Sequence, residues 1–224
     1  ATHSRDLRLL VPRLVYAFTN LDTSGANHIL NEAISARSVE SVCINLLQPA
    51  LARVTDLWAS RQMSTPEERF ATNYVRAHLF SIFHRTPERT DGPLAFIGSG
   101  PREQNEIGAL MLAAFWRRAG MRVIYLGPEV DGGALVEEAR TRRPTLIALW
   151  ISTPQRVRSL ARLAKQIAQM DGARPMLGFY GPIFLRNPEL QRKVPGVYLG
   201  DDAATATFHL TNLLGAEHIV PQPR

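Results

Sequence analysis

A helical bundle followed by a doubly wound parallel sheet, an α + α/β architecture, is the fold class that this sequence predicts. Apolar residues at positions 7–84 recur only at helical spacing. Two prolines and a glycine interrupt the apolar pattern at 86–93, as they do in a linker. Beyond it the periods of strand and helix alternate, which is typical of a parallel sheet covered on both faces. We therefore expect a four-helix bundle domain at 1–86 and a five-stranded sheet domain at 93–224.

The four helices of the bundle follow from apolar stripes and from the residues that break them. The first stripe starts at Leu7 and ends at Phe18. Thr65 is expected to cap the last helix, with Pro66 at its first position and Glu68 where a capping box places its acid. Short connections between the helices predict an antiparallel bundle. The helices are expected at about 7–18, 26–36, 39–60, with a bend near Pro49, and 65–83.

The sheet domain contains five short apolar runs that suit buried strands, separated by helical segments. Ligands of such sheets bind beyond the carboxyl ends of the strands. The loops expected to carry function are those at 99–106, 127–131, 152–155, 179–183 and 200–203. Strands are expected at 94–99, 122–126, 145–151, 175–179 and 196–199, and helices at 104–119, 131–142, 154–170 and 203–214.

Composition narrows the function classes. Of the 224 residues, 45% are hydrophobic and 21% are charged, as in an ordinary globular protein. No apolar run is long enough to span a membrane and Ala1 does not open a signal-peptide pattern, so we expect no membrane partner. A single cysteine, Cys43, fits a cytoplasmic location. The sequence lacks a nucleophile elbow, a phosphate loop and a paired histidine with a carboxylate, which predicts that the chain is not an enzyme.

The formal net charge of +6 comes from 26 basic and 20 acidic residues. The basic residues are scattered, with their densest group between Arg140 and Lys165 on segments expected to be helical. No helix-turn-helix, zinc finger or RNA-binding signature accompanies them. We therefore interpret most of them as a solvated surface and expect no sequence-specific DNA binding by these residues.

The stretch from Leu94 to Pro128 reads strand, polar loop, helix, strand. Its loop contains Glu103-Gln-Asn105-Glu-Ile-Gly108, in the frame where cobalamin-binding domains have Asp-x-His-x-x-Gly. With it, the phrases 106–113 and 117–128, the pair Gln48-Pro49, and Trp58 ten residues before Glu68 carry a resemblance over nearly the whole chain. The chain resembles the sensory half of the cobalamin-dependent, light-responsive MerR-type regulators, the CarH-like family. The resemblance implies a Rossmann-like (flavodoxin-like) sheet of the B12-binding type below a four-helix cap.

The resemblance also shows where this sequence departs from the family. The family's lower axial histidine falls at Asn105, and its upper-face histidine falls at Arg69. A neutral carboxamide is a poor ligand for a soft low-spin metal, whereas imidazole suits it. The family's Gly-Gly pair, where the nucleotide tail of cobalamin packs on bare backbone, aligns with Gly178-Phe179, and its Ser-x-Leu reads Ser152-Thr153-Pro154. The cofactor-binding residues that the resemblance implies are therefore Trp58, Glu68, Arg69, Glu103, Asn105, Gly108, Ser152, Thr153, Gly178 and Phe179, with no metal ligand among them.

Each of these residues also has a purely structural interpretation. Trp58 fits a core aromatic of the bundle, Glu68 a capping residue and Asn105 a helix cap. Arg69 fits either a solvated position or one that faces a ligand's carboxylates. Ser152 fits a turn, and the Phe179 ring competes with a nucleotide tail unless it turns into the core.

The resemblance implies a ligand- or light-sensing module of a transcriptional regulator, with a corrinoid or related tetrapyrrole held between bundle and sheet to control oligomerisation. Three cofactor states stay open: a corrinoid without protein axial ligands, a tail-less tetrapyrrole such as biliverdin or haem, and no cofactor with a role in protein contacts alone. A corrinoid carrier of a methyltransferase is the alternative from another class. The expected partners are the cofactor, a second copy of the chain in a homo-oligomer, and DNA only through an attached N-terminal MerR-type domain.

Overall fold

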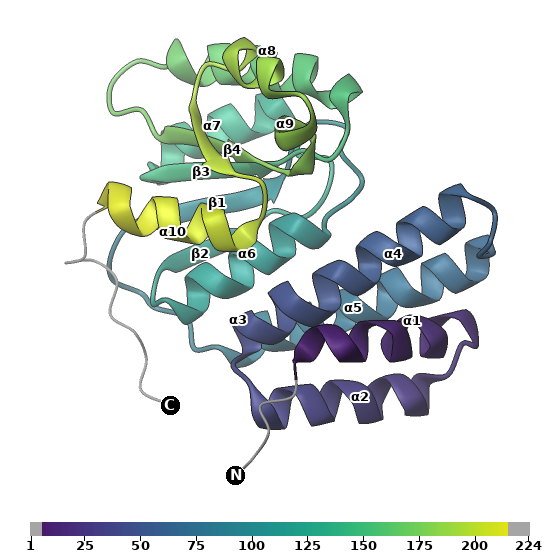
Figure 1. Cartoon of the computed structure of the whole chain (residues 1–224). Coiled ribbons are helices and arrows are strands. Elements are labelled where there is room, and N and C mark those ends of the chain that lie inside the picture. Colours follow the sequence, from purple (N-terminus) through teal and green to yellow (C-terminus); the bar gives the residue numbers. More distant parts are fainter. Residues whose placement is uncertain (1–5, 215–224) are drawn as a thin grey trace. The chain divides into compact units, whose positions relative to one another are not determined.

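The computed structural model describes residues 6–214 (Figure 1). It divides into a helical unit that ends at His78 and a sheet unit that begins at Leu79. The division falls inside the last helix of the bundle, α5 (Thr65–Arg85), ahead of the linker segment 86–93. Among residues 6–214, no helix combines the length and the apolarity needed to cross a membrane.

The helical unit contains the four expected helical segments. A 3-10 turn, η1 (Leu7–Leu10), leads into α1 (Val11–Thr19), and α2 (Thr23–Ala36) follows. The predicted helix at 39–60 is a continuous run of α3 (Val39–Val42), a π-helical turn η2 (Cys43–Leu47) and α4 (Gln48–Ala59). The irregularity expected near Pro49 therefore takes the form of a π turn just before that proline, which has no N–H to give to an earlier carbonyl.

The start of α5 differs by one residue from the expectation. The backbone N–H of Ser64 donates to Glu67 Oε2 at 2.6 Å, and the N–H of Glu67 donates to Ser64 Oγ at 3.4 Å. The reciprocal capping box is thus Ser64 with Glu67, and not Thr65 with Glu68. The reason is that Thr65 already belongs to the helix, so the cap and its acid both lie one position earlier. Glu68 is consequently free of the capping role.

The sheet unit has the expected five parallel strands in the order β2-β1-β3-β4-β5. They are β1 (Leu94–Ser99), β2 (Arg122–Tyr125), β3 (Leu146–Trp150), β4 (Met176–Tyr180) and β5 (Val197–Gly200). The predicted doubly wound sheet is confirmed. The change of direction in strand order lies between β1 and β3, where such sheets bind ligands.

Helices cover both faces of this sheet, as the apolar strands require. α6 (Ile107–Arg118) and α10 (Ala203–Leu214) contact each other and cover one face. α7 (Gly132–Arg142), α8 (Pro154–Ala168), α9 (Pro182–Arg186) and the 3-10 helix η3 (Pro188–Lys193) cover the other. The sequence pattern did not predict α9 and η3, which are too short to show a helical period.

Alternation along β3 and β4 sends neighbouring side chains to opposite faces. Leu149 and Phe179 pack in the core beneath α7 and α8. Trp150 and Tyr180 are also buried, and they pack against each other with ring centroids 5.3 Å apart on the α6 side. This alternation decides which of the predicted site residues share a surface.

Candidate functional site

Glu103 is the centre of the hydrogen-bond network at the carboxyl edge of the sheet. Its side chain is only 4% exposed, so its charge needs partners. Its Oε2 accepts from the backbone N–H of Ser152 at 2.8 Å and from the Ser152 hydroxyl at 2.9 Å. Its Oε1 accepts from the N–H of Asn105 at 3.0 Å, and its backbone carbonyl accepts from the N–H of Glu129 at 2.9 Å. One residue thus ties together the loops that follow β1, β2 and β3.

Asn105 stands on the outer side of this network. It is exposed, and its Oδ1 accepts from the backbone N–H of Ile107 at 3.1 Å at the start of α6. Its backbone carbonyl accepts from the Ser99 hydroxyl at 2.8 Å. The carboxamide oxygen therefore pairs the first free N–H of α6 from one residue before the N-cap, Glu106, whose own side chain makes no capping hydrogen bond.

Gly108, in the first turn of α6, is contacted by Trp150 of β3 and by Tyr180 of β4. A Cβ built at this glycine would clash with three atoms of the Trp150 indole, and the Tyr180 hydroxyl donates to the Gly108 carbonyl at 3.1 Å. Position 108 is glycine because the indole packs directly on its α-carbon. Burial raises the pKa of Tyr180 well above its ordinary value, so its hydroxyl keeps its proton and the hydrogen bond.

Gly178 and Phe179 do not share a surface. A Cβ at Gly178 would clash with Leu199 of β5, so that side chain already covers the bare backbone. The Phe179 ring lies on the opposite face, with the rings of Phe184 and Tyr198 at 4.9 and 5.8 Å between centroids. The Phe179 ring lies in the core beneath α7 and α8. The space on the α6 face of the sheet, which Phe179 was expected to fill, is filled instead by Trp150, Tyr180 and Leu199.

Ser152 and Thr153, although neighbours in the chain, also differ in their surroundings. Ser152 is half-buried and both of its donors bind Glu103, so it closes the loop rather than facing solvent. Thr153 is exposed and precedes α8 without a capping hydrogen bond from its side chain. Of the sheet-unit predictions, Asn105 and Thr153 present side chains at the edge, whereas Glu103, Gly108, Gly178 and Phe179 are buried.

The three predicted residues of the helical unit gather where α4 ends and α5 begins. Trp58 is 45% exposed, and its indole N–H donates to the Thr65 hydroxyl at 3.2 Å. Glu68, one turn after Thr65, accepts from the Thr72 hydroxyl at 2.9 Å. Arg69 has a side chain that is 75% exposed, with its Nε 3.9 Å from Glu68 Oε2. Trp58 is therefore no core aromatic, and the three form a mixed aromatic, acidic and basic group open to solvent.

Sequence reasoning missed Trp150 and Tyr180. Both end a strand at the carboxyl edge, and the same period-two alternation that places Gly178 beside them could have found them. The indole N–H of Trp150 is buried and makes no hydrogen bond within the part of the chain that the structure describes. Burial also lowers the pKa of His78, beside the Tyr74 ring in the helical unit, away from the exposed trio.

These residues do not fit a cobalamin held in the manner that the resemblance implies. Asn105 offers a carboxamide, a poor metal ligand, and its oxygen already accepts from the first N–H of α6. The bare backbone at Gly108 and Gly178 is covered by Trp150 and Leu199, so an inserted nucleotide tail would have to displace buried side chains. Over residues 6–214, no three His, Cys, Asp or Glu side chains gather as a metal site.

Comparisons with known proteins place the chain in a family. Models described as B12 binding domains match residues 10–80 and residues 95–207. The chain is 29% identical over 130 residues to the HTH-type transcriptional repressor CarH of Myxococcus xanthus, covering 57% of this chain and 42% of that protein. It is 25% identical over 129 residues to CarA of the same organism, covering 58% and 43%. The chain thus spans less than half the length of the curated relatives that it matches.

The fold is shared with solved corrinoid proteins at low sequence identity. The monomethylamine corrinoid protein of Methanosarcina barkeri superposes with a TM-score of 0.68 at 16% identity, covering 89% of this chain and 96% of that one. A cobalamin-binding protein of Desulfitobacterium hafniense DCB-2 gives 0.50 at 14% identity, covering 92% and 98%. The helical cap, the five-stranded order of the sheet and the two matching models lead to one conclusion: the chain belongs to the B12-binding domain family, with distant similarity to the CarH and CarA regulators.

Proposed function

We propose that this chain is the sensory half of a transcriptional regulator of the CarH and CarA type, and that it senses a ring-shaped ligand without giving it a metal bond. The Glu103 network is the observation that carries the proposal. A buried carboxylate with three donors fixes the loops after β1 and β3 in one arrangement. A fixed set of loops at the carboxyl edge, at the change in strand order, is what ligand binding in such a sheet requires.

The packing beside this edge favours a ring that lacks an inserted tail. Trp150 and Tyr180 fill the α6 side of the sheet, and Leu199 covers Gly178. Opening this region would cost the burial of two large aromatic side chains. A tail-less tetrapyrrole such as biliverdin or haem therefore suits the edge better than a complete cobalamin. Within the helical unit itself, Trp58, Glu68 and Arg69 are proposed to contact a ring ligand through ring stacking and through a guanidinium that pairs with propionates.

The absorbance spectrum of the purified protein tests the ligand class. We expect addition of biliverdin or haemin to give a bound spectrum with a one-to-one endpoint, and hydroxocobalamin to bind more weakly. Tight binding of hydroxocobalamin with a histidine-ligated spectrum would contradict the proposal. If none of the three probes binds, the chain would instead be a cofactor-free interaction module, which the full packing at Trp150 and Tyr180 also favours.

Asn105→His tests the missing metal ligand directly. The variant restores an imidazole at the lower loop, so hydroxocobalamin added to it should give the spectrum of a nitrogen-ligated cobalt. Asn105→Asp is the matched control, because aspartate keeps a capping oxygen but adds no imidazole. If Asn105→His behaves like Asn105→Asp, the loop does not face the ring. A methyltransferase carrier role is disfavoured by the same asparagine.

The output of such a sensor is proposed to be a change in assembly. We expect light scattering to show a homo-oligomer whose size changes with ligand or with light. DNA recognition is proposed to depend on a MerR-type domain attached to this part of the protein, since the repressors that it resembles are more than twice as long as the matched region. A monomer under every condition, dark and lit, with and without each probe, would argue against a regulator.

A further inference from the structure

The basic residues of α7 and α8, two neighbouring helices of the sheet unit, differ in whether they form ion pairs within their own helix. On α7, Arg140 bonds Glu137 at 2.5 Å and Arg142 bonds Glu138 at 2.7 Å, so each cation is neutralised one turn away. On α8, Arg158, Arg162 and Lys165 are exposed, and residues 154–168 contain no acid. None of these three makes an ion pair within the described range. The positive charge of α8 is thus not compensated by its own helix.

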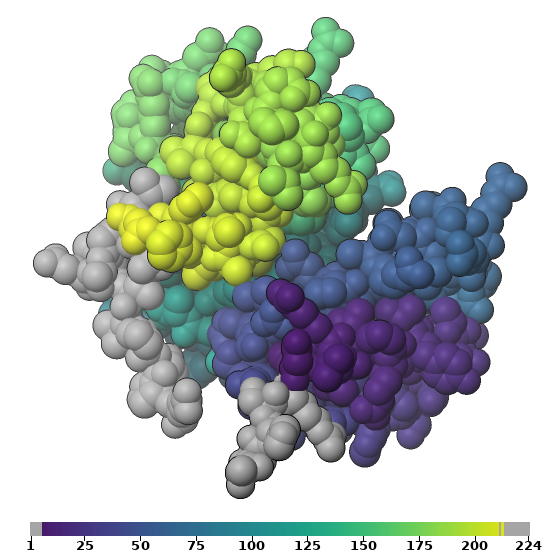
Figure 2. All heavy atoms as spheres, in the orientation of Figure 1, coloured from purple at the N-terminus to yellow at the C-terminus, as the bar shows by residue number. Residues whose placement is uncertain are grey.

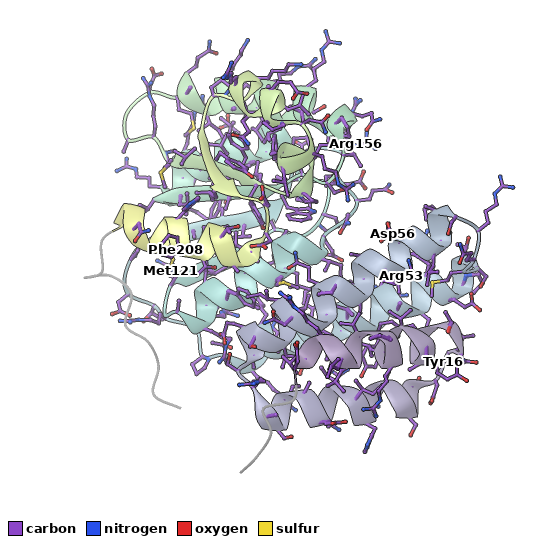
Figure 3. All side chains as sticks on the ribbon, in the orientation of Figure 1. Tyr16, Arg53, Asp56, Met121, Arg156 and Phe208 are labelled. Atoms are coloured by element: carbon purple, nitrogen blue, oxygen red, sulfur yellow. The ribbon has the colours of Figure 1, made fainter. Side chains whose placement is uncertain are left out.

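The α8 cations form a stripe and not a scatter. Spacings of four and three residues place Arg158, Arg162 and Lys165 within about 60° of arc on a helix of 100° per residue. The opposite side of α8 packs in the core, except for Arg156 at the start of the helix. Its buried residues are Val157, Leu160, Leu163, Ala164 and Ile167. At the start of the helix, Arg156 projects outward from the ribbon (Figure 3).

The surface continues from α8 onto η3 and α9, which follow one another in contact. Arg186, Arg192 and Lys193 are exposed there, with Glu189 as the single acid of these two elements. Leu185 of α9 is 63% exposed and supplies an apolar group among the cations. The residues of η3 and α9, yellow-green in the space-filling view, lie on the visible surface of the sheet unit (Figure 2).

We propose that this surface, the α8 stripe with η3 and α9, docks an acidic helical segment of another protein. Carboxylates at every third or fourth residue of a partner helix match the spacing of Arg158, Arg162 and Lys165. An exposed leucine within a charged surface fits a protein interface, where an apolar contact sits inside a polar rim. A nucleic acid duplex is wider than one helix, so it would also reach α7, which contacts α8 and carries the exposed Glu137 and Glu138.

Two triple variants with the same loss of charge test the surface. Arg158→Gln, Arg162→Gln and Lys165→Gln remove the α8 stripe, and Arg140→Gln, Arg142→Gln and Arg143→Gln remove the α7 cations. Glutamine keeps a similar helix propensity, so circular dichroism should show both variants folded. The probe is a synthetic helical peptide of about 20 residues with glutamates along one face, and the reference is a peptide of the same composition in shuffled order.

We expect the α8 variant to bind the striped peptide roughly tenfold more weakly than the unmodified chain, and the α7 variant to lose less than about threefold. The affinity of the unmodified chain should fall between about 50 and 150 mM salt. Equal binding by the α8 variant, or equal binding of the shuffled peptide, would overturn the proposal. Tighter binding of a duplex of about 20 base pairs at 150 mM salt, lost in the α8 variant, would assign the surface to nucleic acid instead. No binding of the striped peptide by the unmodified chain would also overturn it.

Discussion

Glu103 in the sheet unit and Glu68 in the helical unit were both predicted to contact a cofactor, yet their surroundings differ. Glu103 is 4% exposed and accepts hydrogen bonds from three donors on two other residues. The Glu68 side chain is 23% exposed and accepts from one hydroxyl, that of Thr72. Both oxygens of the first carboxylate are used by donors of the protein, whereas the second has an oxygen near the exposed Arg69 guanidinium. Two glutamates predicted to contact the same cofactor therefore have different surroundings and different roles in the structure.

The largest expected effect is a loss of stability when Glu103, and not Glu68, is replaced. Glu103→Ala leaves three buried or half-buried donors without their acceptor, and we expect the unfolding free energy to fall by about 3 kcal/mol. Urea denaturation followed by tryptophan fluorescence measures it. Ser152→Ala is the graded control, since it removes only the hydroxyl donor and should cost about 1 kcal/mol. If both variants unfold like the unmodified chain, the network does not hold the edge.

A second variant probes the packing beside Glu103. Gly108→Ala places a methyl group against the Trp150 indole, and we expect a loss of about 2 kcal/mol from overpacking. Gly133→Ala on α7 is the matched control, because its Cβ would meet no atom closer than 3.4 Å. Thermal unfolding should therefore shift downward for the first variant and not for the second. A stable Gly108→Ala variant would mean that the indole moves aside, which would weaken the case against an inserted tail.

The smallest stability effect is expected at Glu68. Glu68→Ala should change the unfolding free energy by no more than about 0.5 kcal/mol, since its interactions are partly exposed. If Glu68 contacts the ligand, the same variant should weaken biliverdin or haemin binding. Glu67→Ala is the control one residue away: it breaks the capping box and should cost about 1 kcal/mol without changing ligand affinity. The opposite pattern would show that only the cap matters here.

Sequence periodicity was sufficient for the order and type of the main elements. The strand at 94–99 was predicted to the residue, and the bounds of the other four strands differ by one residue at one or both ends. Continuous apolar runs mark buried parallel strands, but they do not fix the terminal residues. The start of α5 was misplaced by one residue because the sequence offers two capping boxes. Ser64 and Thr65 are both suitable N-cap residues, and each has a glutamate three residues later, Glu67 or Glu68. Only the backbone geometry shows which of the two capping boxes forms, and it is the one with Ser64.

The site was harder to predict than the fold because a sequence motif gives the order of residues along the chain. It does not say on which face of the sheet each side chain lies. The family's Gly-Gly pair falls at Gly178-Phe179, two neighbours on a strand, but a strand sends neighbouring residues to opposite sides. Gly108 was expected to face a ligand, whereas an aromatic side chain from β3, distant in the sequence, accounts for it. Such a contact between residues 108 and 150 cannot be seen in a local pattern. Asn105 was predicted with both roles open; its Oδ1 accepts from the first N–H of α6, whereas the N-cap position itself is Glu106.

The π turn at Cys43–Leu47 has a consequence for how this protein tolerates insertion and deletion. A π turn closes its hydrogen bonds over one more residue than an α turn does, so it stores a one-residue insertion within a continuous helix. Deleting one residue at 43–47 would restore a regular α turn that covers nearly the same rotation, so α4 would keep its orientation about the helix axis. The Trp58 indole would then still face Thr65. A deletion within α4 before Trp58, where no extra residue is stored, would instead rotate the later residues by about 100° and turn the indole away from Thr65.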